Sequence, residues 1–398
     1  MNAFFASVEQ QSNPALRGKP IAVIGAAKRT IITTCSYEAR AFGVKTGMNS
    51  WEARQKCPQL IFVVGNNRKY TYTSKQIIAI MREYTPMVEV FSIDEAFLDV
   101  TGCLSLFGSA ERIAQLIKER IGKELGLTCS VGIAPNKLLA KLASDMKKPD
   151  GLTVIAPERV AQVMERVPIQ DLCGIGAKMH QHLAKFGIRT CGELGRFPVE
   201  ILKRHFGVTG EKLHYMGLGF DESPVIPEEE AEEVKSVGHS TTLDNDITER
   251  PEILIYLLQL SEMVGRRARK YQVAGRTVTL TVRYADFTTF SRQQSRASHT
   301  NNSEEIYQAA VKILQGVELT QPVRLLGVKI SSLRQHTEQL PLFAADRKKA
   351  LVANAMDSVN NRFGDFAVTF GSLVGKEGGS KVISPAWKPE GVRNVDAD

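Results

Sequence analysis

The chain has 398 residues, of which 43% are hydrophobic and 24% charged, and its formal net charge is +8. This composition excludes a disordered chain and predicts two to four domains with hydrophobic cores. The positive charge favours nucleic acid as a partner over a membrane, since no apolar run could cross a bilayer and no secretory signal opens the sequence. Six scattered cysteines without a Cys-x-x-Cys pair predict reduced thiols and a soluble, cytoplasmic protein.

The predicted elements change character along the chain. Residues 1 to about 66 mix short helices and strands, and the next hundred alternate between the two. The elements expected there are a helix near 71–84, a hairpin at 88–100, a helix near 105–126, a strand over 127–133 and a helix after Pro135. Residues 167–224 are predicted to be helical with glycine-containing turns, and the acidic run 227–233 is predicted to be a linker.

The second half of the chain shows a β-α-β-β-α-β order. Its elements are strand 235–243, helix 249–271, strands 276–284 and 287–299, helix 303–315 and strand 322–333. A four-stranded sheet with two helices on one face is the natural arrangement for this order. One further helix is expected near 347–360.

The run 33–43 contains a candidate anion site. Ser36 is a suitable N-cap and Gly43 a suitable stop, which predicts about two turns of helix. Tyr37 and Arg40 are three residues apart and therefore neighbours on that helix. A phenol and a guanidinium at a helix start can hold a phosphate, although such a pair can also simply be a packing contact.

The pair Asp94-Glu95 lies between two β-rich runs, at the expected turn of the hairpin. Adjacent side chains on a straight strand point to opposite faces, so the two acids can share a site only if the chain bends there. One or two carboxylates together with substrate phosphates are a typical site for Mg²⁺. The alternative is a solvated acidic turn.

Three further runs suggest contacts with phosphates. Lys147 and Lys148 follow the helix after Pro135, where they can either stabilise a helix C-terminus or meet a bound phosphate. Gly174 and Gly176 fit a helix-hairpin-helix turn that brings backbone N–H groups to a DNA phosphate, or an ordinary glycine-capped turn. In the β-rich region, basic residues on or beside strands fit either DNA-backbone binding or a solvated sheet face: Arg283, Arg292, Arg296 and Arg324.

Two of these runs, 33–43 and 92–100, occur in an ordered set with residues 2–9 before them and residues 136–151, which include Lys147 and Lys148, after them. Together they resemble the Y-family translesion DNA polymerases, most closely the DinB or polymerase IV branch. The resemblance implies an α+β multidomain, right-hand polymerase with palm, fingers, a helical thumb (helix-hairpin-helix) and a β-α-β-β-α-β little-finger domain. The expected bounds are palm 1–3 and 67–166 with a truncated first strand, fingers 4–66, thumb 167–224, linker 225–234, little finger 235–335 and tail 336–398.

The resemblance also implies roles for single residues. Asp94 and Glu95 would be catalytic and would ligate two Mg²⁺ ions, with the Met1 backbone nearby. Phe5 would be the steric gate against a ribose 2′-hydroxyl, and the residues contacting the triphosphate of the dNTP would be Tyr37, Arg40 and Lys148. The segment 339–343 resembles the motif by which bacterial polymerases bind the sliding clamp, with its contacts at Gln339, Leu340, Leu342 and Phe343.

The implied function is low-fidelity, template-directed DNA synthesis across damaged template, by two-metal nucleotidyl transfer from dNTPs onto primer-template DNA. A monomer is expected. One departure is that the family's third metal carboxylate, an aspartate, would fall one residue before Met1, and neutral Asn2 is no good substitute. Either translation starts upstream, or the chain is a catalytically weakened or inactive DNA- and clamp-binding protein. A third alternative, a metal-dependent nuclease, is disfavoured because a nuclease has no triphosphate to bind.

Overall fold

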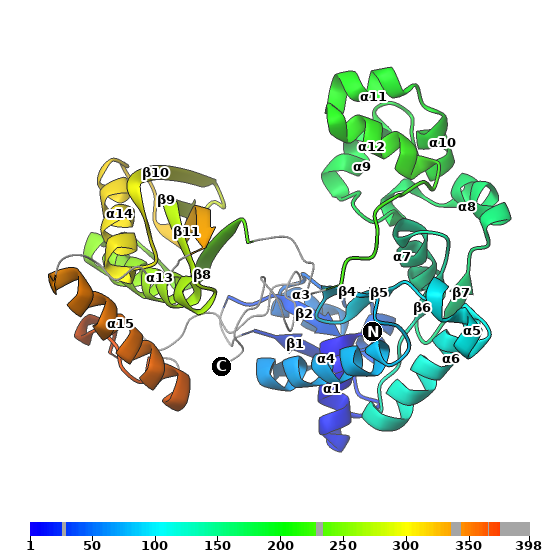
Figure 1. The fold of residues 1–398 in the computed structure, drawn as a ribbon, viewed down its shortest axis with the longest axis horizontal. Coiled ribbons are helices and arrows are strands. Elements are labelled where there is room, and N and C mark those ends of the chain that lie inside the picture. The colour runs from blue at the N-terminus through cyan, green and yellow to red at the C-terminus, as the bar shows by residue number, and fades with distance from the viewer. Residues whose placement is uncertain (26–28, 228–233, 336–343, 365, 375–398) are drawn as a thin grey trace. The chain divides into compact units, whose positions relative to one another are not determined.

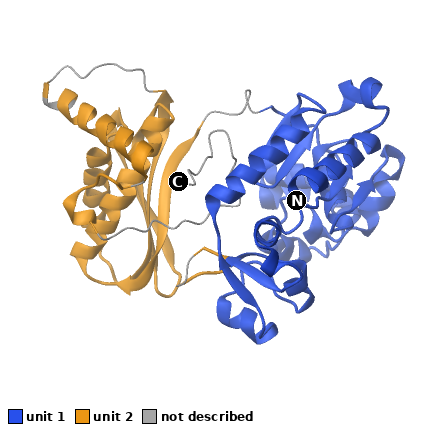
Figure 2. Cartoon of the chain, turned by 90° about the horizontal axis from the view of Figure 1, so that it is seen from below, with its two compact units in different colours: residues 1–23, 32–231, 385–391 blue, residues 24–31, 232–384, 392–398 orange. Residues whose placement is uncertain are grey.

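The computed structural model describes residues 1–25, 29–227, 234–335, 344–364 and 366–374 (Figure 1). Two compact units emerge from the internal contacts (Figure 2). The first comprises mainly residues 1–23 and 32–231, and the second mainly residues 24–31 and 232–384. No helix among the described residues is long and apolar enough to cross a membrane.

The first unit begins with short elements, as predicted. A three-stranded sheet has the order β2-β1-β3 and is accompanied by three short helices. The elements are α1 (Phe4–Ser12), β1 (Ile21–Ile24), β2 (Ile32–Cys35), α2 (Tyr37–Ala41), α3 (Ser50–Lys56) and β3 (Ile61–Val64). Strand β1 lies at the centre of this sheet and is buried along its whole length, and one face of α1 is buried as well, which explains why the helix and the sheet fold together.

Next come the elements that carry the acidic hairpin. They are α4 (Asn67–Arg82), β4 (Val88–Ser92), β5 (Glu95–Leu98), α5 (Leu104–Phe107), α6 (Ala110–Arg120), β6 (Val131–Ile133), α7 (Lys137–Met146) and β7 (Leu152–Val154). The antiparallel pairing of β4 with β5 confirms the predicted hairpin, and β6 pairs with β7 in parallel. The single helix predicted over 105–126 is wrong, because Gly108 adopts a φ of +88° and Ser109 caps a new helix. The strand predicted over 127–133 begins only at Val131.

The helical region expected after residue 167 is present. It contains α9 (Ala177–Ala184), α10 (Cys191–Arg196), α11 (Val199–Phe206) and α12 (Val208–Gly217), preceded by α8 (Val160–Arg166). Their buried side chains share one core with Leu138, Leu139 and Leu142 of α7. Helix α7, which ends just before the candidate lysines Lys147 and Lys148, is therefore held between the hairpin on one side and this helical region on the other.

The second unit has the predicted β-α-β-β-α-β order. Its elements are β8 (Ser236–Ile247), α13 (Arg250–Lys270), β9 (Val273–Tyr284), β10 (Thr289–Thr300), α14 (Ser303–Gln315) and β11 (Val323–Gln335). The strands form an antiparallel sheet of order β10-β9-β11-β8, and both helices pack on one face of it. Strict alternation along β9 places Val278, Leu280 and Val282 in the core and threonines on the other face.

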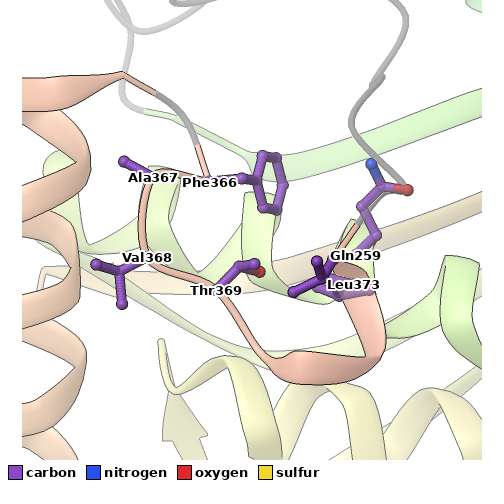
Figure 3. Close-up of a pocket in the computed structure, with 7 residues that line it drawn as sticks. Gln259, Phe366, Ala367, Val368, Thr369 and Leu373 are labelled. Atoms are coloured by element: carbon purple, nitrogen blue, oxygen red, sulfur yellow. The ribbon is translucent and has the colours of Figure 1, made fainter.

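A C-terminal extension docks on this unit. The helix α15 (Ala344–Phe363) covers the residues predicted to be helical, and its Asp357 accepts two hydrogen bonds from Arg269 of α13, at 2.6 and 2.9 Å. The segment after α15 borders a pocket together with Gln259 of α13 (Figure 3). The pocket lining given by the described residues is apolar or neutral, so it carries no group suited to acid–base or metal chemistry.

Candidate active site

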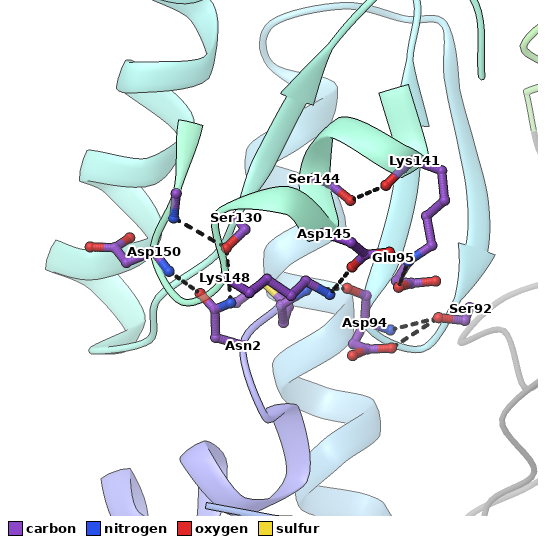
Figure 4. A network of polar contacts seen from close by, with 12 residues as sticks. Asn2, Ser92, Asp94, Glu95, Ser130, Lys141, Ser144, Asp145, Lys148 and Asp150 are labelled. Carbon is purple, nitrogen blue, oxygen red and sulfur yellow. Dashed lines mark hydrogen bonds and ion pairs between the residues drawn. The ribbon is translucent and has the colours of Figure 1, made fainter. Parts of the chain in front are cut away.

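The two hairpin carboxylates lie where the chain bends. Asp94 is in the turn and Glu95 is the first residue of β5, opposite Ser92 of β4. The hydroxyl of Ser92 donates to Asp94 Oδ1 at 2.9 Å and fixes the direction of that carboxylate (Figure 4). The bend required for both acids to serve one site is therefore present.

A chain of ion pairs runs from Glu95 along helix α7 (Figure 4). Lys141 pairs with Glu95 and also, at 3.3 Å, with Asp145. Asp145 in turn pairs with Lys148 at 2.6 Å. The charges alternate in sign, so each group has an opposite partner although all four lie partly out of water.

This arrangement shifts two ionisation equilibria. Burial acts to lower the pKa of Lys141, but the hydrogen bond and charge of Glu95 and the charge of Asp145 outweigh it, and the pKa is raised. Burial acts to raise the pKa of Asp145, but the hydrogen bond from Lys148 and the charges of Lys141 and Lys148 outweigh it, and the pKa is lowered. Both groups are therefore charged at neutral pH.

The first two residues lie beside this network. The Met1 ammonium donates to the backbone oxygen of Asp94 at 2.7 Å, which brings the Met1 backbone to the hairpin turn. Asn2 is 1% exposed; its side-chain amide nitrogen donates to Ser130 Oγ at 3.0 Å and its side-chain oxygen accepts from the Asp150 N–H at 3.0 Å. Asn2 thus fastens the turn that follows Lys148, and its amide group is engaged there (Figure 4).

The ring of Phe5 is held by a second aromatic residue. It stacks on Tyr70 of α4, with the centroids 4.4 Å apart and the planes at 26°. The Tyr70 hydroxyl donates to Glu9 at 2.7 Å, and Lys69 pairs with the same carboxylate at 2.6 Å. Burial, with the hydrogen bond and charge of Glu9 adding to it, raises the pKa of Tyr70, so the phenol stays protonated and keeps donating.

The two residues of the expected anion site lie side by side on α2. Ser36 caps the helix, and the Arg40 guanidinium lies 4.7 Å from the centre of the Tyr37 ring. The Tyr37 hydroxyl is buried and has no hydrogen-bond partner among the described residues. A buried orphan hydroxyl costs free energy unless a ligand satisfies it, which fits a phosphate oxygen at this place.

The glycines before α9 fit a backbone contact. Gly174 has a φ of +95°, a conformation that favours glycine, and Gly176 is the N-cap of α9. A Cβ on Gly176 would meet nothing within 4 Å in the described part of the chain, so packing does not require this glycine. Its open backbone is what a DNA phosphate would need.

Three of the four candidate arginines of the second unit do not share one face. Arg283 follows Val282 and lies on the sheet face away from the helices, where its Nε donates to Thr289 at 2.8 Å. Arg292 is opposite buried Leu280 and so lies on the helix-covered face, at the edge strand. Arg296 pairs with Glu305 of α14 at 2.7 Å, on that same side. The segment 339–343, predicted to bind a clamp, lies outside the described residues.

Comparison with known proteins identifies the family. Residues 1–145 match the impB/mucB/samB family, residues 234–342 its C-terminal domain, and residues 170–221 a thumb domain described for DNA polymerase-iota. The DNA polymerase IV proteins of Pelotomaculum thermopropionicum and Moorella thermoacetica are each 44% identical to this chain, with 92% of both sequences covered. The chain belongs to the Y-family of DNA polymerases.

The fold agrees with this assignment. A solved Y-family DNA polymerase chimera of Dbh and Dpo4 matches with a TM-score of 0.74 and 29% identity, over 83% of this chain and 96% of that one. The predicted right-hand architecture with a helix-hairpin-helix thumb is thereby confirmed. The alternative of a non-catalytic relative finds no support in these matches.

Sequence reasoning missed several residues around this Y-family site. Lys141 and Asp145 were not singled out, although their spacing of four on a helix that ends near Lys148 was a usable signal. Tyr70 gave no signal, because its contact with Phe5 spans 65 positions of the sequence. For Tyr70 and for the pairing of Lys141 with Glu95, the missing information was a contact between separate elements.

Proposed function

We propose that this Y-family polymerase carries out template-directed DNA synthesis of low fidelity across damaged template. The observation that carries the proposal is the 44% identity to DNA polymerase IV proteins over 92% of the chain, joined to a hairpin with two carboxylates beside Lys148. In the reaction, the 3′-hydroxyl of the primer attacks the α-phosphate of a dNTP and pyrophosphate leaves. The test is primer extension by the full chain with dNTPs and Mg²⁺, on an intact template and on one with a bulky base lesion. Absence of extension on both templates would contradict the proposal.

Asp94 and Glu95 would hold two Mg²⁺ ions. Two carboxylates at a bend, combined with phosphate oxygens from the substrate, are a fitting oxygen donor set for this cation. The carbonyl oxygen of Met1 would be the donor from that backbone, since the bond from the Met1 ammonium to the backbone oxygen of Asp94 holds Met1 beside the turn. Among the described residues no group of three or more acidic, histidine or cysteine side chains gathers, and the remaining coordination positions would be filled by substrate oxygens or, before the substrate binds, by water. When bound, the ions lower the pKa of the primer hydroxyl and stabilise the leaving pyrophosphate.

Three side chains would bind the triphosphate. Tyr37 and Arg40 offer a hydroxyl and a guanidinium at the start of α2, and the orphan hydroxyl of Tyr37 supports this role. Lys148 would add an ammonium group from the turn that Asn2 fastens. The ring of Phe5 would contact the sugar and exclude a ribose 2′-hydroxyl, with Tyr70 behind it.

Two surfaces would bind the primer-template DNA. The turn at Gly174 and Gly176 would contact a phosphate through its backbone N–H groups. The face of the second unit away from its helices would track the backbone, since the strand register lines small polar residues across it with Arg283 at one end. One row across the four strands consists of Ser295, Thr277, Ser331 and Ser236. A second row consists of Ser291, Thr281, Gly327 and Ser240. Arg292 and Arg296 would reach DNA only from the sheet edge.

The proposal also includes a clamp contact, the domain bounds, the oligomeric state and the location. Residues 339–343 would bind a bacterial sliding clamp through Gln339, Leu340, Leu342 and Phe343. The proposed domains are palm 1–3 and 67–166, fingers 4–66, thumb 167–224, linker 225–234, little finger 235–335 and tail 336–398. The protein is proposed to act as a monomer. A cytoplasmic location is supported by six free cysteines, which suit a reducing compartment.

A further inference from the structure

Helix α7 presents two lysines to the acidic hairpin, one turn apart. Lys137 pairs with Glu89 of β4 at 2.7 Å, and Lys141 pairs with Glu95 of β5. The two lysine side chains have nearly equal exposure, 16% and 18%. They differ in what they neutralise, because Glu95 is a proposed metal ligand and Glu89 is not.

Lys141 also has a second acceptor within reach. Its Nζ lies 3.3 Å from Asp145, which is one turn further along the same helix. An ammonium group can therefore leave Glu95 without becoming an unpaired buried charge, since Asp145 can take it over. Ser144 lies on this turn as well, but its hydroxyl donates to the backbone oxygen of Lys141 and leaves the ammonium group available.

Resting on the proposed function of the hairpin acids, we propose that Lys141 is a positioning residue for Glu95. Its ammonium group pairs with the Glu95 carboxylate before a divalent cation binds. When the cation binds, the ammonium group turns towards Asp145. The cation must therefore displace a positive charge from its own ligand. Lys141 lowers the intrinsic affinity of the site, and Asp145 offsets part of that loss by accepting the displaced lysine.

The two residues are predicted to have opposite effects on cation binding. Replacing Lys141 with methionine keeps the stem and removes the competing charge, so the affinity should rise. Replacing Asp145 with asparagine leaves Lys141 only Glu95 as a charged partner, so the affinity should fall. General damage to the helix would weaken binding in both variants.

The test is titration of the full chain with Mn²⁺, without DNA or nucleotide, following free Mn²⁺ by electron paramagnetic resonance. We expect Lys141→Met to bind Mn²⁺ about tenfold more tightly. A single nearby opposite charge changes the proton affinity of a carboxyl by at least about this factor, and we expect it to change the cation affinity similarly. Asp145→Asn should bind several-fold more weakly, and Lys141→Arg, which keeps the charge, should bind like the parent. The matched control is Lys137→Met, which removes an equally buried lysine of the same helix and should leave the affinity unchanged.

The outcomes separate this inference from the proposed function. Unchanged or weaker Mn²⁺ binding by Lys141→Met, or an equal gain in Lys137→Met, would overturn the role of Lys141. If Glu95→Gln bound Mn²⁺ as tightly as the parent, the metal site itself would be wrong and both proposals would fall. Weaker binding by Glu95→Gln with no gain in Lys141→Met would overturn the positioning role alone.

Discussion

The rings of Phe5 and Tyr70 stack with their centroids 4.4 Å apart, although the two residues belong to different helices. Tyr70 is itself fixed by its hydrogen bond to Glu9. The position of the Phe5 ring is therefore determined by a rigid neighbour and not only by its own rotamer. A residue that discriminates by steric exclusion needs such support, because a ring that could swing aside would exclude nothing.

Phe5→Ala should admit ribonucleotides, because it removes the ring that would collide with the 2′-hydroxyl. The measurement is the ratio of kcat/KM for dNTP and rNTP in single-nucleotide extension. We expect Tyr70→Phe, which keeps the stacked ring and loses only the bond to Glu9, to retain most of the discrimination. An unaltered ratio in Phe5→Ala would mean that Phe5 is only a core residue.

Asp94→Ala and Glu95→Ala should each abolish primer extension while DNA binding stays nearly intact, since these acids are proposed to hold metal and not DNA phosphate. Extension assays and fluorescence anisotropy with labelled primer-template measure the two properties separately. The control is Asp99→Asn, an acid just after β5 whose carboxylate accepts from the Thr101 N–H at 2.9 Å. Near-normal extension in either alanine variant would refute the assignment.

The local parts of this site could be predicted from the sequence. The hairpin with its acids at the turn, the capped helix with Tyr37 beside Arg40, and the β-α-β-β-α-β order all depend on residues close together in the chain. The sequence could not separate Arg283 from Arg292 by face, because that depends on the strand register. Nor could it predict the partner of Glu95, because Lys141 comes from a helix whose placement depends on its core with α8 to α12.

Asn2→Ala should lower stability and weaken nucleotide binding together. It leaves the partly buried Asp150 N–H without its acceptor and removes one of the two partners of the Ser130 hydroxyl, which keeps the Gly151 N–H, at a cost of about 1 kcal/mol. Because the freed turn carries Lys148, the KM for dNTP should rise more than kcat falls. Urea unfolding and steady-state extension measure the two effects. A large drop in kcat with KM unchanged would indicate that Asn2 acts at the reacting atoms and not through the turn.

Replacing Gln339, Leu342 and Phe343 with alanine should reduce synthesis on clamp-loaded DNA and leave activity on a short bare primer unchanged. The reason is that the glutamine anchor and both apolar side chains would be lost, while the residues that bind dNTP and primer remain. Equal loss on the two substrates would show that the segment belongs to the fold and not to a clamp contact.

His239 makes the second unit sensitive to acid. It pairs with Val328 across the sheet and so lies on the helix-covered side, near Arg267 of α13. Burial, with the charge of Arg267 adding to it, lowers the pKa of His239 to about 3. Part of the residue reaches solvent, but protein atoms surround most of the imidazole. Burial and the positive charge of Arg267 both disfavour the protonated ring, so both lower the pKa.

The unfolded chain takes up a proton on this histidine below its ordinary pKa of about 6.5, whereas the folded chain does not until the pH is far lower. The contribution of His239 to the free energy of unfolding should therefore be constant above pH about 6.5. Below that pH it should fall by up to about 1.4 kcal/mol per pH unit. Urea unfolding midpoints between pH 8 and pH 5 measure this slope. His239→Gln, which cannot titrate, should flatten the dependence by that amount, and an identical slope in the variant would show that other groups cause the acid sensitivity.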